Sequence, residues 1–349
     1  MGQSDYGKFT REEILSQPKI WEQVIRGWAG LNIEDFPNPA NYDQVLFIGC
    51  GSTFYLSRWA ARMNEFHTGV FSRSAPSSDL LLYPDHWLNK EQKTLLVASS
   101  RSAATTETVR AIDRFQQHYQ GDVVVITCYG DQQMASQTEF VISAEPAQEQ
   151  SIAQTRSFSS MMLGQAFFIS RGLPTDIGLK LRQSGQLLLD NYFETINSIA
   201  NNENLQRFFF LGSGPFYGLA SECMLKMKEI TLSYSESFHS MEFRHGPMSM
   251  VNENTLVIGL LGENNIEQEF AVLREMKVKG AKILAIAESL PEGLASEGEQ
   301  IILNSGLTLL WRSPLYLPAM QWLAYSRGMI KGLNPDRPHN LDAVVVLDE

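Results

Sequence analysis

Cysteine is scarce in this 349-residue chain, which contains Cys50, Cys128 and Cys223 and no others. The three are widely spaced and form neither a CxxC pair nor a cluster with histidines, so the pattern excludes a zinc site and a disulfide framework. We therefore expect a metal-free protein of a reducing cytoplasm. Cys50 and Cys223 are interpreted as packed small side chains rather than nucleophiles, because buried cysteine is common and inert.

Basic residues are also few. Asp and Glu number 39 against 28 Lys and Arg, which gives a formal net charge of −11. Nucleic-acid binding needs an excess of basic side chains, so we expect no nucleic-acid partner. No helix-turn-helix segment precedes the first predicted domain, which counts against a transcription regulator. An anionic ligand would have to be held by a local cluster of groups.

Long apolar runs are missing as well. No stretch is long enough to span a bilayer, the first residues MGQSDYGKFT have no apolar signal-peptide core, and Tyr6 breaks the myristoylation pattern after Met-Gly. We expect no membrane association. The chain is nevertheless 44% hydrophobic, and its length favours two globular domains.

An internal repeat sets the expected fold. QVLFIGCGSTFYLSRWAARM (44–63) and RFFFLGSGPFYGLASECMLKM (207–227) share an apolar strand, a Gly-x-Gly turn and an amphipathic helix. Short Val/Ile/Leu runs alternating with helical patterns follow each copy, which indicates parallel sheets with right-handed crossovers. We predict two tandem, doubly wound α/β domains of the flavodoxin-like three-layer type, at 30–190 and 195–335. A helix precedes the first domain, and 336–349 form a C-terminal tail.

The Gly-x-Gly turns do not complete a dinucleotide fingerprint. Phe54 stands where the third glycine of GxGxxG belongs, and no acidic residue closes the second strand, GVFSRSA. The sequence therefore argues against a nicotinamide cofactor, and we expect no cofactor of any kind.

The stretch LLVASSRSAATTETVRA (95–111) is rich in hydroxyls where an apolar strand ends. It runs from the strand through Ser99, Ser100, Ser102, Thr105 and Thr106 into a helix. Small hydroxyls, backbone N–H groups and the helix dipole together suit a phosphate, and sites in open α/β sheets lie at the carboxyl ends of strands. The alternative is that these residues are helix caps, but one cap does not require five hydroxyls.

Proton-handling groups gather in ESFHSMEFRHGPMSM (236–250), where Glu236, Glu242, His245 and their neighbours precede Gly246 and Pro247. The simplest interpretation is a solvated surface loop, since Gly and Pro punctuate such loops.

These motifs in this order resemble the sugar-isomerase (SIS) domain family, with likeness from about Gln44 to Val346. The markers are GCGST (49–53), SSRSAATTET (99–108), LKMKEI (225–230), EFRHGP (242–247) and NPDRPHNLDAVVV (334–346). The resemblance extends to the isomerase half of glucosamine-6-phosphate synthase and to the fructoselysine-6-phosphate deglycase branch.

The resemblance implies roles for particular residues. Glu229 takes the place of the carboxylate that moves a proton between C1 and C2, and His245 that of the histidine linked to ring opening, with Lys226 and Glu242 in support. The sugar-phosphate pocket is implied for Gly51, Ser52, Thr53, Ser100, Arg101, Ser102 and Thr105. The family also implies a homodimer whose sites are shared, with the histidine entering from the neighbouring subunit.

Proton-transfer chemistry agrees with these roles, because one partly buried carboxylate can serve both steps and an imidazole can relay the ring-opening proton. Each role has a structural alternative. Lys226 and Glu229 would also form an ordinary surface pair three residues apart, and His245 could simply bond a loop carbonyl.

Three departures from the family pattern limit the activity. The chain begins almost directly with the SIS region, so we expect no glutamine-hydrolysing domain. Ala343 stands where the synthase has its Schiff-base lysine, and an alanine cannot form an imine. Ala103 and Ala104 replace Gly and Glu of the phosphate loop, which could change the backbone there, because only glycine adopts positive φ freely.

We therefore predict a cytoplasmic, cofactor-free phosphosugar isomerase or an amino-sugar-phosphate deglycase or deaminase. The alternative is a SIS module that binds a phosphosugar and regulates without turning it over.

Overall fold

The computed structural model describes residues 6–294 and 297–344. The chain divides into two compact units. Over the described residues, the first unit comprises 19–149, 156–179 and 342–344, and the second comprises 6–18, 150–155, 180–294 and 297–341. The last residues of the predicted tail, 345–349, lie outside the described part.

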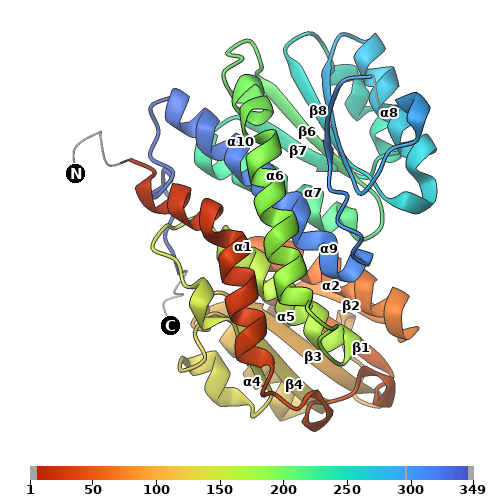
Figure 1. The fold of residues 1–349 in the computed structure, drawn as a ribbon. Helices are drawn as coiled ribbons and strands as arrows, with labels where there is room; N and C mark the ends of the chain where they lie inside the picture. The colour runs from red at the N-terminus through yellow and green to blue at the C-terminus, as the bar shows by residue number, and fades with distance from the viewer. Residues whose placement is uncertain (1–5, 295–296, 345–349) are drawn as a thin grey trace. The chain divides into compact units, whose positions relative to one another are not determined.

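The first unit is built on one parallel sheet with strand order β2-β1-β3-β4-β5, of which Figure 1 labels β1 to β4. Its central strands are buried on both faces, as continuous apolar runs require. The strands are β1 (Gln44–Gly49), β2 (Ser72–Pro76), β3 (Lys93–Ser100), β4 (Gln120–Thr127) and β5 (Val141–Ser143). The helices are α2 (Ser52–Thr68), α3 (Ser77–Leu82), α4 (Thr106–His118) and α5 (Arg156–Ser170).

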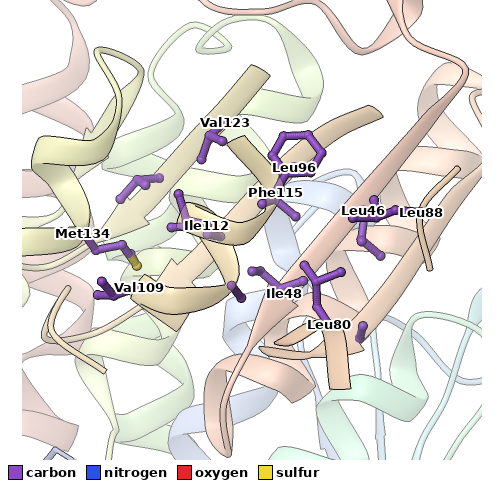
Figure 2. Packing of buried hydrophobic residues seen from close by; sticks show 14 of the residues in the cluster. Leu46, Ile48, Leu80, Leu88, Leu96, Val109, Ile112, Phe115, Val123 and Met134 are labelled. Carbon is purple, nitrogen blue, oxygen red and sulfur yellow. The ribbon is translucent and has the colours of Figure 1, made fainter. Parts of the chain in front are cut away.

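One core cluster of the first unit lies between α4 and one face of this sheet. Figure 2 shows Ile112 and Phe115 of α4 beside Leu46, Ile48 and Leu96 of the strands, and all five are buried. Val109, one turn earlier on α4, belongs to the same cluster. Apolar residues three and four positions apart thus turn one face of α4 inward and leave the opposite face to the surface.

The second unit repeats this architecture with a parallel sheet of order β10-β9-β8-β6-β7. The strands are β6 (Arg207–Gly212), β7 (Tyr234–Phe238), β8 (Thr255–Leu260), β9 (Lys282–Ala287) and β10 (Glu299–Ile302). The helices within this unit are α7 (Phe216–Thr231), α8 (Ile266–Val278), α9 (Leu309–Arg312) and α10 (Leu317–Ile330). Two further helices, α1 (Lys8–Trp28) and α6 (Ile177–Ala200), each contribute residues to both units.

Both sheets have the order 2-1-3-4-5 when their strands are numbered within each unit, which is the flavodoxin-like pattern. The predicted fold class, two tandem parallel α/β units, is confirmed. Each unit is built from several separate ranges of the chain, whereas the predicted domain limits are continuous ranges. Those limits stay predictions.

The repeated Gly-x-Gly turn has the same geometry in each copy. Gly51 and Gly214 adopt φ of 55° and 57°. Gly49 and Gly212, the last residues of β1 and β6, each leave no room for a side chain. A Cβ at Gly49 would lie 2.5 Å from the Thr53 backbone, and one at Gly212 would lie 2.5 Å from the Phe216 backbone. Close approach of the helix to the strand therefore explains the first glycine of each turn, and positive φ explains the second.

Candidate functional site

The predicted phosphate-binding residues come from two neighbouring strands of the first unit. β1 leads through Gly51 into α2, and β3 leads through residues 101–105 into α4. The two strands are paired and parallel, so their carboxyl ends lie at the same edge of the sheet. The sheet order reverses between them, and the crevice at this switch point is the general position of ligand sites in open α/β sheets.

The loop after β3 presents hydroxyls that are not used to cap the helix. Thr105 occupies the N-cap position of α4, but its side chain makes no capping hydrogen bond. Its Oγ1 lies 3.2 Å from Oγ of Ser100 instead. Ser102 Oγ accepts a 3.3 Å hydrogen bond from the Ala104 N–H and stabilises the turn. The capping alternative therefore fails to account for Thr105, and the Ser100–Thr105 pair stays a candidate for phosphate contact.

The turn after β1 uses one of its hydroxyls structurally. Thr53 Oγ1 accepts from the Cys50 N–H and donates to the Cys50 carbonyl, each at 2.9 Å. Ser52 is buried beside it, and Gly51 is exposed. Burial raises the pKa of the Cys50 thiol, which fits a packed side chain rather than a nucleophile. Thr53 thus stabilises the turn, and Gly51 and Ser52 remain the candidates for ligand contact.

Arg101 makes contacts that the sequence did not indicate. Its side chain is only 8% exposed, and Nη1 lies 3.4 Å from Oε2 of Glu149, whose own side chain is fully buried. Nη2 donates to the backbone carbonyl of Ala343 at 3.2 Å. Glu149 also accepts from the Ser157 N–H at 3.1 Å. Arg101 therefore stabilises the C-terminal tail, and Glu149, an isolated acid before α5, carried no sequence signal.

Ala103 adopts a left-handed backbone conformation of the kind that glycine adopts freely. It is fully buried with φ of 51°, and its carbonyl accepts from the Met134 N–H at 2.8 Å. A left-handed non-glycine residue costs about 1–2 kcal/mol. Packing and this hydrogen bond hold Ala103 in a left-handed conformation.

The candidate base lies near the end of α7 in the second unit. Glu229 Oε2 is 2.5 Å from Nζ of Lys226, and the same ammonium lies 3.5 Å from Oε1 of Glu222. Glu229 is 18% exposed at its side chain, while Lys226 and Glu222 are almost completely buried. The surface-pair alternative is therefore wrong, because the lysine is in the core. Glu222 was missed, although its spacing of four from Lys226 was a usable signal.

One side of the EFRHGP turn packs into the core, and the other side is exposed to solvent. Phe243 is fully buried, with its ring 5.0 Å from Phe209 and 5.4 Å from Phe238. Arg244 makes a two-pronged ion pair with Glu275, at 2.8 Å and 2.5 Å, and this contact raises the arginine pKa and lowers the carboxyl pKa. His245 and Glu242 are both exposed, and the His245 N–H donates to the Glu242 carbonyl.

Glu229 and His245 belong to opposite faces of the second sheet. The EFRHGP turn packs through Phe243 against Phe209 and the buried residues of α8. α7 and α10 pack together, and Arg327 of α10 covers the ring of Phe208, the next residue along β6. Because neighbouring strand residues point to opposite faces, one chain does not bring the two candidate catalytic groups together.

The described residues contain no cluster of three or more His, Cys, Asp or Glu side chains placed to hold a metal ion. Within the same ranges, no helix is both long and apolar enough to cross a membrane.

Sequence comparison places this geometry in context. Residues 203–306 match the SIS domain model. A glutamine–fructose-6-phosphate aminotransferase of Chlamydia caviae is 25% identical over 98% of this chain, which spans 59% of that relative's length. A Streptomyces coelicolor protein whose name proposes a D-galactosamine-6-phosphate deaminase is 26% identical, with 96% of this chain and 92% of that protein covered.

Solved structures agree with the fold. A tagatose-6-phosphate ketose/aldose isomerase from Escherichia coli superposes with a TM-score of 0.85 at 23% identity, covering 95% of each chain. A glucosamine-6-phosphate deaminase from Thermotoga maritima gives 0.80 at 25% identity, covering 97% of this chain and 99% of its own. Residues 203–306 of the second α/β unit are thus similar to a SIS domain, and nearly the whole chain resembles proteins named as phosphosugar isomerases, aminotransferases and deaminases.

Proposed function

We propose that this chain is a phosphosugar enzyme that moves a proton between C1 and C2 of a sugar or amino-sugar phosphate. The observation that carries the proposal is the Glu222–Lys226–Glu229 arrangement, in which a buried lysine holds one partly exposed carboxylate in place. A surface ion pair has no need for a buried ammonium, whereas a base that serves two carbons needs a fixed position.

The residues divide the chemistry between them. Ser100 and Thr105, with the start of α4, hold the phosphate, and Lys226 orients Glu229. Glu229 takes the proton from one carbon, and the C–H electron pair forms the C1–C2 double bond of an enediol while the carbonyl oxygen gains a proton. Return of the proton to the other carbon, with loss of the proton from the hydroxyl on the first carbon to form the new carbonyl, completes the transfer. His245 relays the proton that opens the sugar ring.

Ala343 excludes a Schiff base between the substrate and the side chain at this position. With no lysine at that position, an imine between protein and substrate cannot form there. A substrate that already carries nitrogen at C1, such as a fructosamine 6-phosphate, needs no such lysine. The same proton shift converts it to an aldose imine, which water hydrolyses to a sugar phosphate and a free amine. Plain aldose–ketose isomerisation and amino-sugar phosphate deamination use the same base.

The placement of Glu229 and His245 supports a shared site. Since the two groups lie on opposite faces of one sheet, a second copy of the chain would supply the histidine to the carboxylate of the first. A symmetric two-fold dimer makes two such sites at once.

Deuterium exchange tests the proposal. The protein is incubated in D₂O with hexose 6-phosphates, amino-sugar phosphates and fructosamine 6-phosphates, and deuterium at C1 and C2 is followed by NMR. We expect exchange with at least one class, lost in Glu229→Gln. A regulatory SIS module would bind a ligand and leave its C1 and C2 hydrogens in place. Binding without exchange would therefore contradict the proposed enzymatic activity.

A further inference from the structure

A second candidate binding site lies between α3 and α4 of the first unit, built from the surface face of α4. It is a solvent-open hollow of about 370 Å³. That volume falls within the range of pockets that hold small molecules. The lining residues are Leu81, Arg110, Asp113, Arg114, Gln117 and His118.

The basic residues of this hollow are spaced to act together. Arg110, Arg114 and His118 are four residues apart on α4, so their side chains lie on one face of the helix. Arg114 Nη1 donates to the backbone carbonyl of Leu81 at 3.2 Å, which fixes one guanidinium at the end of α3. Arg110 is half-buried and has no ion-pair partner among the described residues.

The one acid in the lining does not neutralise the hollow. Asp113 Oδ1 accepts from Gln137 Nε2 at 2.7 Å, and the same amide nitrogen donates to the Val109 carbonyl at 3.1 Å. Two guanidiniums and an imidazole therefore face one carboxylate that already has a partner. On a chain with a net charge of −11, this is a local reversal of sign, and such a concave cationic surface concentrates anions.

We propose that the hollow binds a small phosphorylated metabolite at a site separate from the hydroxyl-rich loop after β3. Guanidinium groups suit phosphate because they donate paired hydrogen bonds in a planar fork. Gln117 adds a neutral donor and acceptor for hydroxyl groups, and Leu81 adds an apolar contact. The hollow is distinct from the proposed enzymatic site, since none of these residues belongs to the candidate catalytic machinery, but its regulatory role rests on the proposed function.

The position of the hollow on α4 suggests what the site is for. α4 begins at Thr106, directly after the Ser100–Thr105 loop, and ends at His118 in the hollow. One rigid helix therefore carries both anion sites, with its N-terminus at one and its last turns at the other. A ligand in the hollow would regulate the first site through the position of this helix.

The test counts anion sites with inorganic pyrophosphate as the probe. Wild-type protein is titrated by calorimetry at low ionic strength, and crystals are soaked with tungstate to locate bound anions by anomalous scattering. We expect two sites per chain. Arg110→Ala with Arg114→Ala should weaken binding in the hollow at least tenfold and leave the loop site intact, while Ser100→Ala with Ser102→Ala should do the reverse.

A charge-matched control separates a specific site from a general field. Arg26→Ala with Arg62→Ala removes the same two charges from exposed positions of the same unit, and it should leave both sites unchanged. Circular dichroism and thermal unfolding verify that each variant is folded. Equal loss of pyrophosphate binding in the two arginine pairs, or a hollow that stays empty in tungstate at low salt, would overturn the proposal.

Discussion

The two α/β units have the same strand order and the same Gly-x-Gly turn, but they use the loop after the third strand in opposite ways. In the first unit this loop is 101–105, and in the second it is 261–265, so the lengths are equal. The fourth residue of the helix that follows is Val109 in α4 and Glu269 in α8. The first loop carries the hydroxyls that we propose contact a phosphate. In the second, the Glu269 carboxylate accepts from the Gly262 N–H at 2.9 Å and from Ser240 at 3.3 Å.

Further charges occupy the second crevice. Arg312 is buried, with Nη2 2.9 Å from Glu263 and Nε 3.8 Å from Glu288. A phosphate at this loop would meet the Glu269 carboxylate, which already accepts from the Gly262 N–H. The duplicated scaffold thus supplies two equivalent crevices, and a few side chains determine which of them is already occupied by carboxylates.

The largest effect is expected for the candidate base. Glu229→Gln keeps the shape of the side chain and removes the base, so turnover should fall by roughly 10² to 10⁴ while phosphosugar binding persists. Steady-state kinetics and a binding titration measure the two quantities. Glu267→Gln makes the same carboxylate-to-carboxamide change at an exposed position of α8. It is the matched control and should behave as wild type. Full activity of the Glu229 variant would remove this residue from the mechanism.

Mixed dimers test whether chains share a site. Glu229→Gln and His245→Ala chains, each inactive, are refolded together in equal amounts. If Glu229 and His245 of one site come from different subunits, random pairing restores about a quarter of wild-type sites, because half the dimers are mixed and each has one intact site. If every site is built from one chain, no activity returns, and mass spectrometry of intact dimers verifies that mixing occurred.

The ion pairs of the second crevice should matter for stability and not for ligand binding. Arg312→Met leaves the largely buried Glu288 without its cation, and the free energy of unfolding should fall by about 2 to 3 kcal/mol, less than for a fully buried pair because Glu263 is half exposed. Urea unfolding measures the loss. A variant with normal stability and weakened phosphosugar affinity would reverse the roles assigned to the two crevices.

The hydroxyls of the first loop should contribute affinity. Ser100→Ala with Ser102→Ala should weaken phosphosugar binding by about 1 to 3 kcal/mol, the value of hydrogen bonds to a charged group. Ser213→Ala, in the Gly-x-Gly turn of the second unit, is the control and should leave affinity unchanged. Equal wild-type affinity for phosphorylated and unphosphorylated sugars would argue against a phosphate at this loop.

The smallest effect concerns the pH dependence of the EFRHGP turn. The pKa of Glu275 is lowered, mainly by its hydrogen bonds from Arg244, so the pair stabilises the fold above the unfolded carboxyl pKa and ceases to do so as pH falls through the lower folded value. The pair is partly exposed, so Glu275→Gln should cost less than about 1 kcal/mol at neutral pH. Thermal unfolding of the two proteins should converge in acid, and a constant difference at all pH values would contradict this.

The features that could be predicted from the sequence depend on residues that are close together in the chain. The apolar strands, the Gly-x-Gly turns and the hydroxyl-rich loop each depend on residues within one short segment. The missed features depend on residues that folding brings together. Glu149 meets Arg101 from 48 positions away, and Arg312 meets Glu263 from a helix near the end of the chain. No local pattern distinguishes such acids from the many on the surface.

Lys226 shows the same limit at short range. Its spacing from Glu229 predicted the ion pair, and spacing alone could not tell a buried lysine from an exposed one. Burial depended on α7 packing against β6, β7 and α10, which is information from the whole unit. The roles proposed for Glu229, His245 and the loop residues stay predictions until the variants are measured.

The bond between Arg101 and the tail has an evolutionary consequence. The guanidinium holds residue 343 by its main-chain oxygen, so this anchor is indifferent to which side chain the position carries. Mutation between alanine and lysine would therefore change the available chemistry without loosening the tail. A lineage could gain or lose imine formation by a single codon change, and Ala343→Lys is the substitution from which a directed-evolution experiment on this chain would start.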